Sequence, residues 1–327
     1  MARDKMEQVG VIQNLPPVVV VTGPTASGKT PVAIELCAAF GGEVINADSM
    51  QVYRFMDIGT AKPNVEDRAK VPHHLIDIVN PDADYSAGRY AVDARRAAAD
   101  IHGRDRIVFL VGGTGLYIRA FLDGLIDAGG ADPVLRESLE LEQAEATDAG
   151  NPGLLHERLA QIDPEAAQKI HPNDQRRLVR ALEIRSMAGT SASALRDRHS
   201  FSDRPYRVLH LALDPDREEL DRRIDRRCAA MVEAGLIREV RALRRRGYTS
   251  ELRPMRAIGY RHINPVVDGS DTLTNATLAM QRDTRRFAKR QRTWLRAVPE
   301  VVYVDPSRVG RLHEAVGEFL DGAAPRK

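Results

Sequence analysis

The sequence is poor in cysteine and has no long apolar run, and both absences narrow the kind of protein that it encodes. It contains two cysteines, Cys37 and Cys228. They lie far apart and outside any metal-binding spacing, which indicates small core residues in a reducing cytoplasm. No segment approaches the ~20 apolar residues of a membrane-spanning helix, and the N-terminus has no signal-peptide core. We therefore expect a cytoplasmic protein without membrane contact.

What is present is the composition of a globular protein in which charge is unevenly placed. The 327 residues are 43% hydrophobic and 29% charged, with room for one large domain or two modest ones. The net charge is +2, but segment 204–296 has 22 basic and 12 acidic residues, so the rest of the chain carries a net −8. Such a local excess favours a phosphate-rich partner, although solvated helix faces would give the same count.

A glycine-rich segment lies between a predicted strand and a predicted helix. The apolar run 18–22 reads as a buried parallel strand, segment 23–30 reads G-P-T-A-S-G-K-T, and 32–40 reads as a helix. Strand, G-x-x-x-x-G-K-[ST] and helix together are the context of a P-loop. We expect Lys29 to supply charge to a di- or triphosphate and Thr30 to supply a hydroxyl for Mg²⁺. The phosphates would be cradled by the loop residues Gly23, Pro24, Thr25, Ala26, Ser27 and Gly28.

Two further predicted strands deliver their following residues to the same rim as the P-loop. Strand 43–46 leads to Asp48, and strand 106–111 leads to the glycines of segment 112–115. Asp48 is either an active carboxylate at this rim or the N-cap of a following helix, and the local sequence does not decide between the two. No Asp ends strand 106–111, so the Walker-B carboxylate of a nucleotide-hydrolysing motor is missing.

The remaining patterns predict an α/β core interrupted by helices. Segment 73–78 reads as a strand whose adjacent histidines point to opposite faces, which makes them a poor metal pair. Segment 123–202 has no strand-like run and reads as an all-helical insertion. The core should resume with a strand over 207–213, a helix over 231–247, a helix from Leu278 to Arg296 and a strand over 301–305.

The predicted fold class is α/β, with a P-loop NTPase-like parallel sheet flanked by helices and an all-helical insertion. We divide the chain into a loose leader (1–17), the first part of the core (18–122), the insertion (123–202), the second part of the core (203–306) and a C-terminal helix and tail (307–327).

Arginines recur at helical spacing in the insertion and in the second part of the core. Arg176 and Arg180 share a face of the predicted helix 175–187, with Arg177 within reach, and both an RNA contact and an ion-paired solvent face fit this pattern. Arg223 and Arg227 share a face of the helix that follows Asp216, and this pair suits closure over phosphates.

The segment 285–296 combines basic residues with two aromatic ones. Arginines and Lys289 would neutralise phosphates, and the rings of Phe287 and Trp294 could stack on unpaired bases. The two aromatics are seven residues apart, so they also fit the core stripe of an amphipathic helix, and we prefer that interpretation for them.

Taken in order, the motifs of this chain resemble those of the tRNA dimethylallyltransferase (tRNA isopentenyltransferase) family. The resemblance extends from about residue 18 to residue 305. It is carried by G-P-T-A-S-G-K-T (23–30), D-S-M-Q-V-Y (48–53), D-I-G-T-A-K-P (57–63), H-H-L-I-D (73–77), G-G-T-G-L-Y (112–117), H-P-N-D (171–174), R-A-I-G-Y (256–260) and K-R-Q-x-T-W-L-R (289–296).

The resemblance implies a transfer rather than a hydrolysis. Members of the family move the dimethylallyl group of dimethylallyl diphosphate to N6 of the adenosine at position 37 of tRNA, 3′ of the anticodon, and release diphosphate. The implied partners are the tRNA anticodon stem-loop and dimethylallyl diphosphate, the implied cofactor is Mg²⁺, and we expect a monomer.

The resemblance also implies roles for single residues. Asp48 would be the base, with Lys29 and Arg223 as further catalytic groups. Arg217 and Arg227 would join the P-loop in holding the diphosphate. Position 176 holds Arg where the family usually has Gln. The implied tRNA-binding residues are Asp48, Ser49, Met50, Gln51, Thr114, Arg136, Arg176, Arg177, Leu178, Val179, Arg180, Arg256 and Arg290.

Three other functions share parts of this pattern. An adenylate isopentenyltransferase would use free AMP as the acceptor, and a P-loop nucleotide kinase would turn over ATP. A non-catalytic RNA-binding protein would bind RNA and transfer nothing. The helical insertion and the basic segment 285–296 favour tRNA, because a free nucleotide needs neither.

Overall fold

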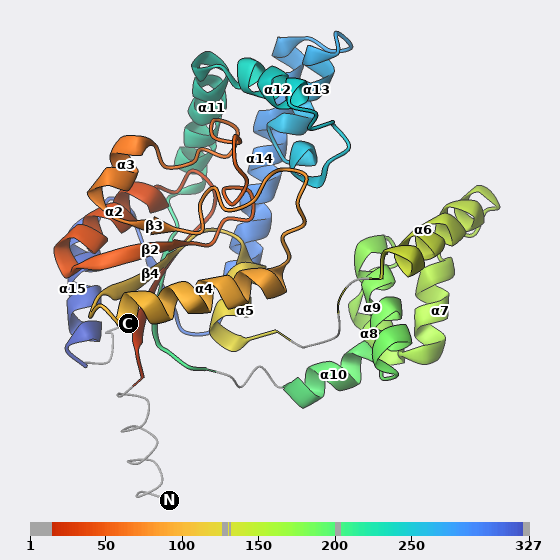
Figure 1. Ribbon diagram of the computed structural model, residues 1–327, viewed down its shortest axis with the longest axis horizontal. Helices are drawn as coiled ribbons and strands as arrows, with labels where there is room; N and C mark the ends of the chain where they lie inside the picture. The colour runs from red at the N-terminus through yellow and green to blue at the C-terminus, as the bar shows by residue number, and fades with distance from the viewer. Residues whose placement is uncertain (1–14, 126–129, 131, 200–203, 323–327) are drawn as a thin grey trace, which may run out of the picture. The chain divides into compact units, whose positions relative to one another are not determined.

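A six-stranded parallel sheet in the order β3-β2-β4-β1-β5-β6 forms the centre of the larger of two compact units, whose described residues are 15–122 and 205–322 (Figure 1). The computed structural model describes residues 15–125, 130, 132–199 and 204–322. The leader residues 1–14 and the tail residues 323–327 lie outside this part. The predicted α/β fold class is confirmed. The strands are β1 (Pro17–Thr22), β2 (Gly42–Asn46), β3 (His73–His74), β4 (Ile107–Val111), β5 (Arg207–Leu213) and β6 (Val301–Val304).

Helices cover both faces of the sheet, because its central strands are apolar on both sides. Val18 to Val21 of β1 are fully buried, and alternate residues enter two separate cores. One face packs against α2 (Lys29–Phe40) and α15 (Val309–Leu320). The residues of the other face pack with those of α4 (Ala87–His102), α5 (Gly115–Asp123), α11 (Arg217–Ala234), α12 (Leu236–Arg245), α13 (Tyr260–Val267) and α14 (Leu273–Arg296).

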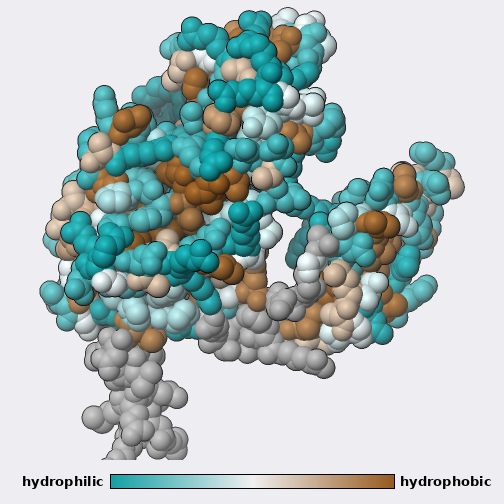
Figure 2. All heavy atoms as spheres, in the orientation of Figure 1, coloured by the Kyte–Doolittle hydropathy of each residue, from teal (hydrophilic) through white to brown (hydrophobic). Residues whose placement is uncertain are grey.

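Two short elements complete this unit, α3 (Val65–Lys70) and the 3-10 helix η1 (Arg253–Arg256). None of the helices in the described ranges is both long and apolar enough to cross a lipid bilayer. Hydrophilic residues dominate the surface over α11 and α12 (Figure 2).

Three predicted boundaries are wrong, each for a local reason. The strand expected over 73–78 ends at His74, because Leu75 and Asp77 have φ of 62° and 58°, outside the strand region. The helix expected over 231–247 is two helices, because Gly235 adopts φ of 106° and ends α11. The last long helix begins at Leu273, five residues before the expected start, where the hydroxyl of Thr272 accepts from the N–H of Asn275.

Residues 123–204 form a second compact unit, which is entirely helical in its described part. Its helices are packed around an apolar core that contains Leu155, Leu159 and Leu178. Asp174 caps α9, which ends at Gly189 in the left-handed region. The helices are α6 (Pro133–Asp148), α7 (Leu154–Ile162), α8 (Pro164–Lys169), α9 (Gln175–Ala188) and α10 (Ala192–His199).

A buried carboxylate ties α6 to α9. The side chain of Glu183 is 0% exposed, and its oxygens accept from Arg136 at 2.9 Å, from Arg180 and from the backbone N–H of Asp132 at 2.7 Å. Burial raises the pKa of Glu183, but the two guanidinium groups outweigh burial and hold the pKa at about 2. Unfolding would give this carboxyl its ordinary pKa of 4.5, so its contribution to stability is present above pH 4.5 and is lost as the pH falls towards 2.

We predict that Glu183→Gln destabilises this helical unit by about 2–4 kcal/mol at neutral pH, because it leaves two cations without their partner. The difference from wild type should shrink as the pH falls below about 4.5. The free energy of unfolding of this unit is measured by titration with denaturant, with limited proteolysis within 123–204 as the signal of unfolding. The control is Glu142→Gln, which removes an exposed pair with Arg158 and should cost less than about 1 kcal/mol. Equal losses for the two variants would contradict the assignment.

Candidate active site

The P-loop connects β1 to α2 in a conformation that only glycine tolerates at its first position. Gly23 has φ of 147°, and a Cβ there would lie 2.4 Å from the carbonyl oxygen of Leu213. Lys29 opens α2, and its ammonium donates to the carbonyls of Gly23 at 3.0 Å and Pro24 at 2.8 Å. Burial, together with the nearby Arg227, lowers the pKa of Lys29 to about 7, and Asp48 partly opposes this effect.

Asp48 follows β2 and closes a tight turn rather than capping a helix. Its Oδ1 accepts from the backbone N–H of Met50 at 2.8 Å, and residues 49–52 form turns. Asn46 braces the residue from both sides, since its Oδ1 accepts the N–H of Asp48 at 3.1 Å and its Nδ2 donates to the Asp48 carbonyl at 3.2 Å. The helix-cap interpretation of Asp48 is therefore wrong, and within the described residues Oδ2 accepts no hydrogen bond.

The loop after β2 is bonded directly to the loop after β4. The N–H of Ala47 donates to the carbonyl of Val111 at 2.7 Å, and the N–H of Thr114 donates to the carbonyl of Ala47 at 3.1 Å. A Cβ at Gly112 would lie 2.2 Å from the oxygen of Ala47, so glycine is required for this approach. The hydroxyl of Thr114 accepts the N–H of Ser49 at 3.0 Å. These contacts place Asp48, Ser49 and Thr114 at one rim.

Two cavities meet at Asp48. The smaller one, of about 50 Å³, is lined by Lys29, Thr30 and Gln51 among others. The larger one, of about 330 Å³, is lined by the polar residues Thr25, Asp48, Ser49, Thr114 and Arg227 among others. Met50, Met231, Ile258, Met280 and Phe287 contribute apolar side chains to the larger cavity, and Arg256, Arg261 and Arg290 contribute basic ones. Asp48 lines both cavities.

Of the three arginines expected at the phosphates, the structure brings Arg227 next to Asp48 and Lys29. Burial lowers the pKa of Arg227, while Asp48 acts in the opposite direction. Arg223 pairs instead with Glu219 at 2.8 Å and lines neither cavity, and Arg217 is exposed at the start of α11.

Gln291 of α14 joins the P-loop to the loop after β4. This side chain is 7% exposed. Its Oε1 accepts the N–H of Thr25 at 2.8 Å, and its Nε2 donates to the carbonyl of Gly113 at 3.0 Å. The side chain thus satisfies two backbone groups that belong to different phosphate-side loops.

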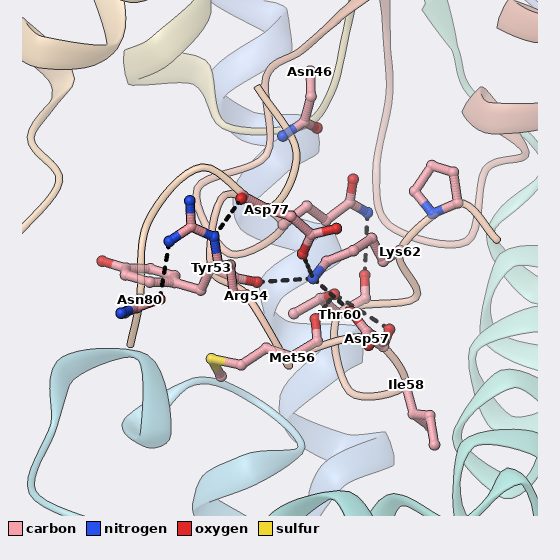
Figure 3. Close-up of polar contacts among 12 residues, drawn as sticks. Asn46, Tyr53, Arg54, Met56, Asp57, Ile58, Thr60, Lys62, Asp77 and Asn80 are labelled. Atoms are coloured by element: carbon pink, nitrogen blue, oxygen red, sulfur yellow. Dashed lines mark hydrogen bonds and ion pairs between the residues drawn. The ribbon is translucent and has the colours of Figure 1, made fainter. Parts of the chain in front are cut away.

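A buried lysine, Lys62, links the segment 53–57 to Asp77 (Figure 3). The ammonium of Lys62 donates to the carbonyl of Tyr53 at 2.8 Å and to the carboxylates of Asp57 and Asp77, each at 2.6 Å. Arg68 balances the second of these carboxylates at 2.8 Å. The buried ammonium of Lys62 is therefore paired with carboxylates, as a buried charge requires.

The adjacent histidines do not form a metal pair. His73 contacts the carbonyl of Val71 at 2.8 Å, and His74 contacts the buried carboxylate of Glu43 at 2.7 Å. The part of the chain that the structure covers contains no cluster of three or more His, Cys, Asp or Glu side chains that could hold a metal ion.

Comparison with known proteins decides the family. The model of the IPP transferase family matches residues 51–298, and that of the isopentenyl transferase family matches residues 16–76. The chain is 49% identical over 304 residues to tRNA dimethylallyltransferase 2 of Geotalea uraniireducens, covering 92% of this chain and 96% of the relative. This chain belongs to the IPP transferase family.

Solved structures of other family members have the same fold. The tRNA isopentenylpyrophosphate transferase of Bacillus halodurans superposes with a TM-score of 0.69 at 39% identity, covering 93% of this chain and 97% of that one. A eukaryotic dimethylallyltransferase described as acting on tRNA superposes with a TM-score of 0.80 at 27% identity, covering 95% and 81%.

The residues that the family resemblance assigns to tRNA binding fall into two groups. Asp48, Ser49, Met50, Thr114, Arg256 and Arg290 line the larger cavity, and Gln51 lines the smaller one. In the helical unit, Arg136 and Arg180 hold Glu183, and the side chains of Leu178 and Val179 are buried. Arg176 and Arg177 are exposed there.

Sequence reasoning assigned no role to several residues that build this site. Gln291 was part of a motif but had no assigned role. It lies four positions before the buried Leu295, so it is a polar residue on the buried face of an amphipathic helix, and such a residue needs hydrogen-bond partners. Trp294 packs against Gly115, whose Cβ would lie 2.3 Å from the indole, which agrees with its interpretation as a core residue. Glu239 carries no local signal, because the amides that it binds lie about 180 residues away, and the bonds of Asn46 to Asp48 and to the carbonyl of Leu75 depend on the loop conformation.

We predict that Gln291→Leu loosens the P-loop, because it leaves the N–H of Thr25 and the carbonyl of Gly113 without their partner, at about 1–3 kcal/mol for each group. Hydrogen exchange of a peptide covering 23–30 should accelerate at least about tenfold. Gln281→Leu on the same helix is the control, since Gln281 makes only a 3.5 Å contact with the carbonyl of Asp225. Unchanged exchange in Gln291→Leu would rule out the bridge.

Proposed function

We propose that this protein transfers the dimethylallyl group of dimethylallyl diphosphate to N6 of the adenosine at position 37 of tRNA. The observation that carries the proposal is the position of Asp48, which borders a cavity with the P-loop lysine and a second cavity with apolar walls and arginines. A carboxylate at such a junction can act on an acceptor while the leaving group is held on the other side.

The leaving diphosphate needs positive charge and N–H donors, because negative charge develops on it as the allylic C1–O bond breaks. Lys29, Arg227 and the P-loop amides are the groups suited to this task. In the free protein the ammonium of Lys29 bonds to two carbonyls of its own loop, and a phosphate oxygen would take their place. The missing Walker-B carboxylate fits a site that transfers an allylic group and hydrolyses nothing.

Mg²⁺ fits the smaller cavity. Thr30 offers a hydroxyl there, and Mg²⁺ commonly takes one or two protein oxygens together with phosphate oxygens and water. When bound, the ion would neutralise part of the diphosphate charge. The absence of a larger ligand cluster within the described ranges agrees with this kind of binding.

The acceptor nitrogen needs a base, because its lone pair is delocalised into the adenine ring. As the N6–C1 bond forms, N6 acquires positive charge and must lose a proton. Asp48 Oδ2 is suited to take that proton, since Oδ1 is already held by the N–H of Met50. The adenosine would have to leave its stack to enter the cavity, at a cost of a few kcal/mol.

The basic residues of the larger cavity suit a polynucleotide acceptor. Arg256, Arg261 and Arg290 contribute to its lining, and guanidinium groups can bind the phosphates that flank an extruded base. The exposed Arg176 and Arg177 of the helical unit are candidates for further phosphate contacts.

We predict that incubation with unmodified tRNA, Mg²⁺ and dimethylallyl diphosphate yields N6-(dimethylallyl)adenosine, detected by mass after the tRNA is digested to nucleosides. Free AMP in place of tRNA should give no product. Prenylated AMP would instead identify an adenylate isopentenyltransferase. Product from neither acceptor, with ATP consumed in the presence of a nucleotide, would favour the kinase.

A further inference from the structure

A carboxylate of α12 holds a turn that lies about 180 residues earlier in the sequence. Oε2 of Glu239 accepts the backbone N–H groups of Asp57 at 3.0 Å and Ile58 at 2.7 Å. Oε1 accepts the N–H of Gly59 at 3.1 Å and the hydroxyl of Tyr260 at 2.7 Å. Three consecutive amides and one hydroxyl therefore converge on one side chain, which none of the functional roles described above uses.

The turn formed by residues 57–61 has little freedom of its own. The N–H of Ala61 donates to the carbonyl of Ile58 at 3.0 Å, and the hydroxyl of Thr60 donates to the carbonyl of Met56 at 2.7 Å. Lys62 fixes its inner side through Asp57 (Figure 3). The outer side is fixed by α12, and the position of the turn thus depends on Glu239.

A second contact of the same region supports this dependence. The guanidinium of Arg246, just after α12, lies 4.0 Å from the ring centroid of Phe55. The ring of Tyr248 stacks on the ring of Phe55, with the two centroids 6.4 Å apart. Phe55 adopts φ of 67°, a strained conformation for a residue with a bulky side chain. The segment 55–59 therefore contacts the α12 region at two places, through Glu239 and through Arg246.

The turn in turn orients Gln51. Nε2 of Gln51 donates to the carbonyls of Thr60 at 3.2 Å and Ala61 at 3.3 Å. Two carbonyl partners fix which end of the amide faces the turn, so the acceptor Oε1 is the end left for another group. Gly59 and Thr60 also line the larger cavity, and a Cβ at Gly59 would lie 2.5 Å from the ring of Tyr260. A small shift of the turn would therefore displace the Gln51 amide, whose two acceptor carbonyls belong to the turn.

We propose that Glu239 is a positioning residue for the active site: it holds the 57–61 turn against Tyr260 and so sets the orientation of the Gln51 amide, which lines the smaller cavity with Lys29, Thr30 and Asp48. The proposal rests on the proposed function of the two cavities that meet at Asp48. A displaced amide beside Asp48 lowers the rate of the bound complex more than the affinity for tRNA, because reactivity depends on alignment of the reacting groups.

The test compares Glu239→Gln with wild type in single-turnover prenyl transfer to tRNA at saturating substrates. Glutamine can accept from some of the four donors, but its NH₂ group opposes the others, so the turn loses its alignment. The expected result is a rate at least about tenfold lower with a tRNA Kd changed less than about threefold. In a Gln51→Ala background the same substitution should lower the rate less than about twofold, since the residue through which it acts is absent.

Glu43→Gln is the matched control. Glu43 is likewise a carboxylate with several side-chain partners, bonded to Arg104 and to His74, but it lies at the opposite end of β2 from Asp48. Its loss should lower the melting temperature and leave the single-turnover rate within about twofold of wild type. If Glu239→Gln does not fold, Tyr260→Phe removes one of the four donors and should give a smaller rate loss that again disappears in the Gln51→Ala background.

A Glu239→Gln protein that is less stable but transfers at the wild-type rate would overturn the proposal and leave Glu239 with a purely structural role. A rate loss that is equally large with and without Gln51 would overturn the coupling through that amide. Both comparisons require that the wild-type protein prenylates tRNA. The absence of product from wild type would instead reject the proposed function.

Discussion

The backbone contact between Ala47 and residues 111–114 is the constraint on which the site depends. It joins the loops that follow β2 and β4, and it requires glycine at position 112. Through it Asp48 stands near Lys29, and Thr114 reaches the N–H of Ser49. Parallel strands bring their carboxyl ends to one edge in any such sheet. Here hydrogen bonds between the loops convert that general proximity into a defined position for one carboxylate.

The second half of the chain completes this edge with side chains that come from helices. Arg227 approaches from α11, Gln291 from α14 and Glu239 from α12. Each acts on a loop of the first half: the hydrogen bonds of Gln291 and Glu239 to these loops span 178 to 266 residues, and the charge of Arg227 acts on Lys29 and Asp48. The cavities therefore exist only when both parts of the core have folded together, which couples the formation of the site to global stability.

The sequence predicted the sheet well because its strands are continuous apolar runs bounded by glycine or polar residues. The P-loop was predictable for the same reason, since its spacing has meaning only between a strand and a helix. The errors arose where a single backbone angle decides the outcome. Leu75 and Asp77 end β3 early through positive φ, and Gly235 divides a continuous helical pattern into α11 and α12.

The arrangement of the candidate catalytic residues was predictable only in part. Asp48 and Lys29 follow from motifs that are local in sequence, and the structure brings them to one cavity. The choice among Arg217, Arg223 and Arg227 depends on how α11 is rotated about its axis, and helical spacing alone does not give that rotation. Helical spacing left an RNA contact and an ion pair open for Arg180, and its pairing with Glu183 became visible only in the tertiary structure, where that carboxylate is buried. The contacts of Glu239 could not be predicted from the sequence for the same reason.

The central claim is that Asp48 is the base at the junction of the two cavities. Its most direct test is the single-turnover rate of prenyl transfer by Asp48→Asn at saturating tRNA and dimethylallyl diphosphate. Asparagine keeps an oxygen for the N–H of Met50 and loses the ability to take the proton. The account predicts a rate at least about 100-fold below wild type, with tRNA affinity within about tenfold. A folded variant that transfers within about fivefold of the wild-type rate would contradict it.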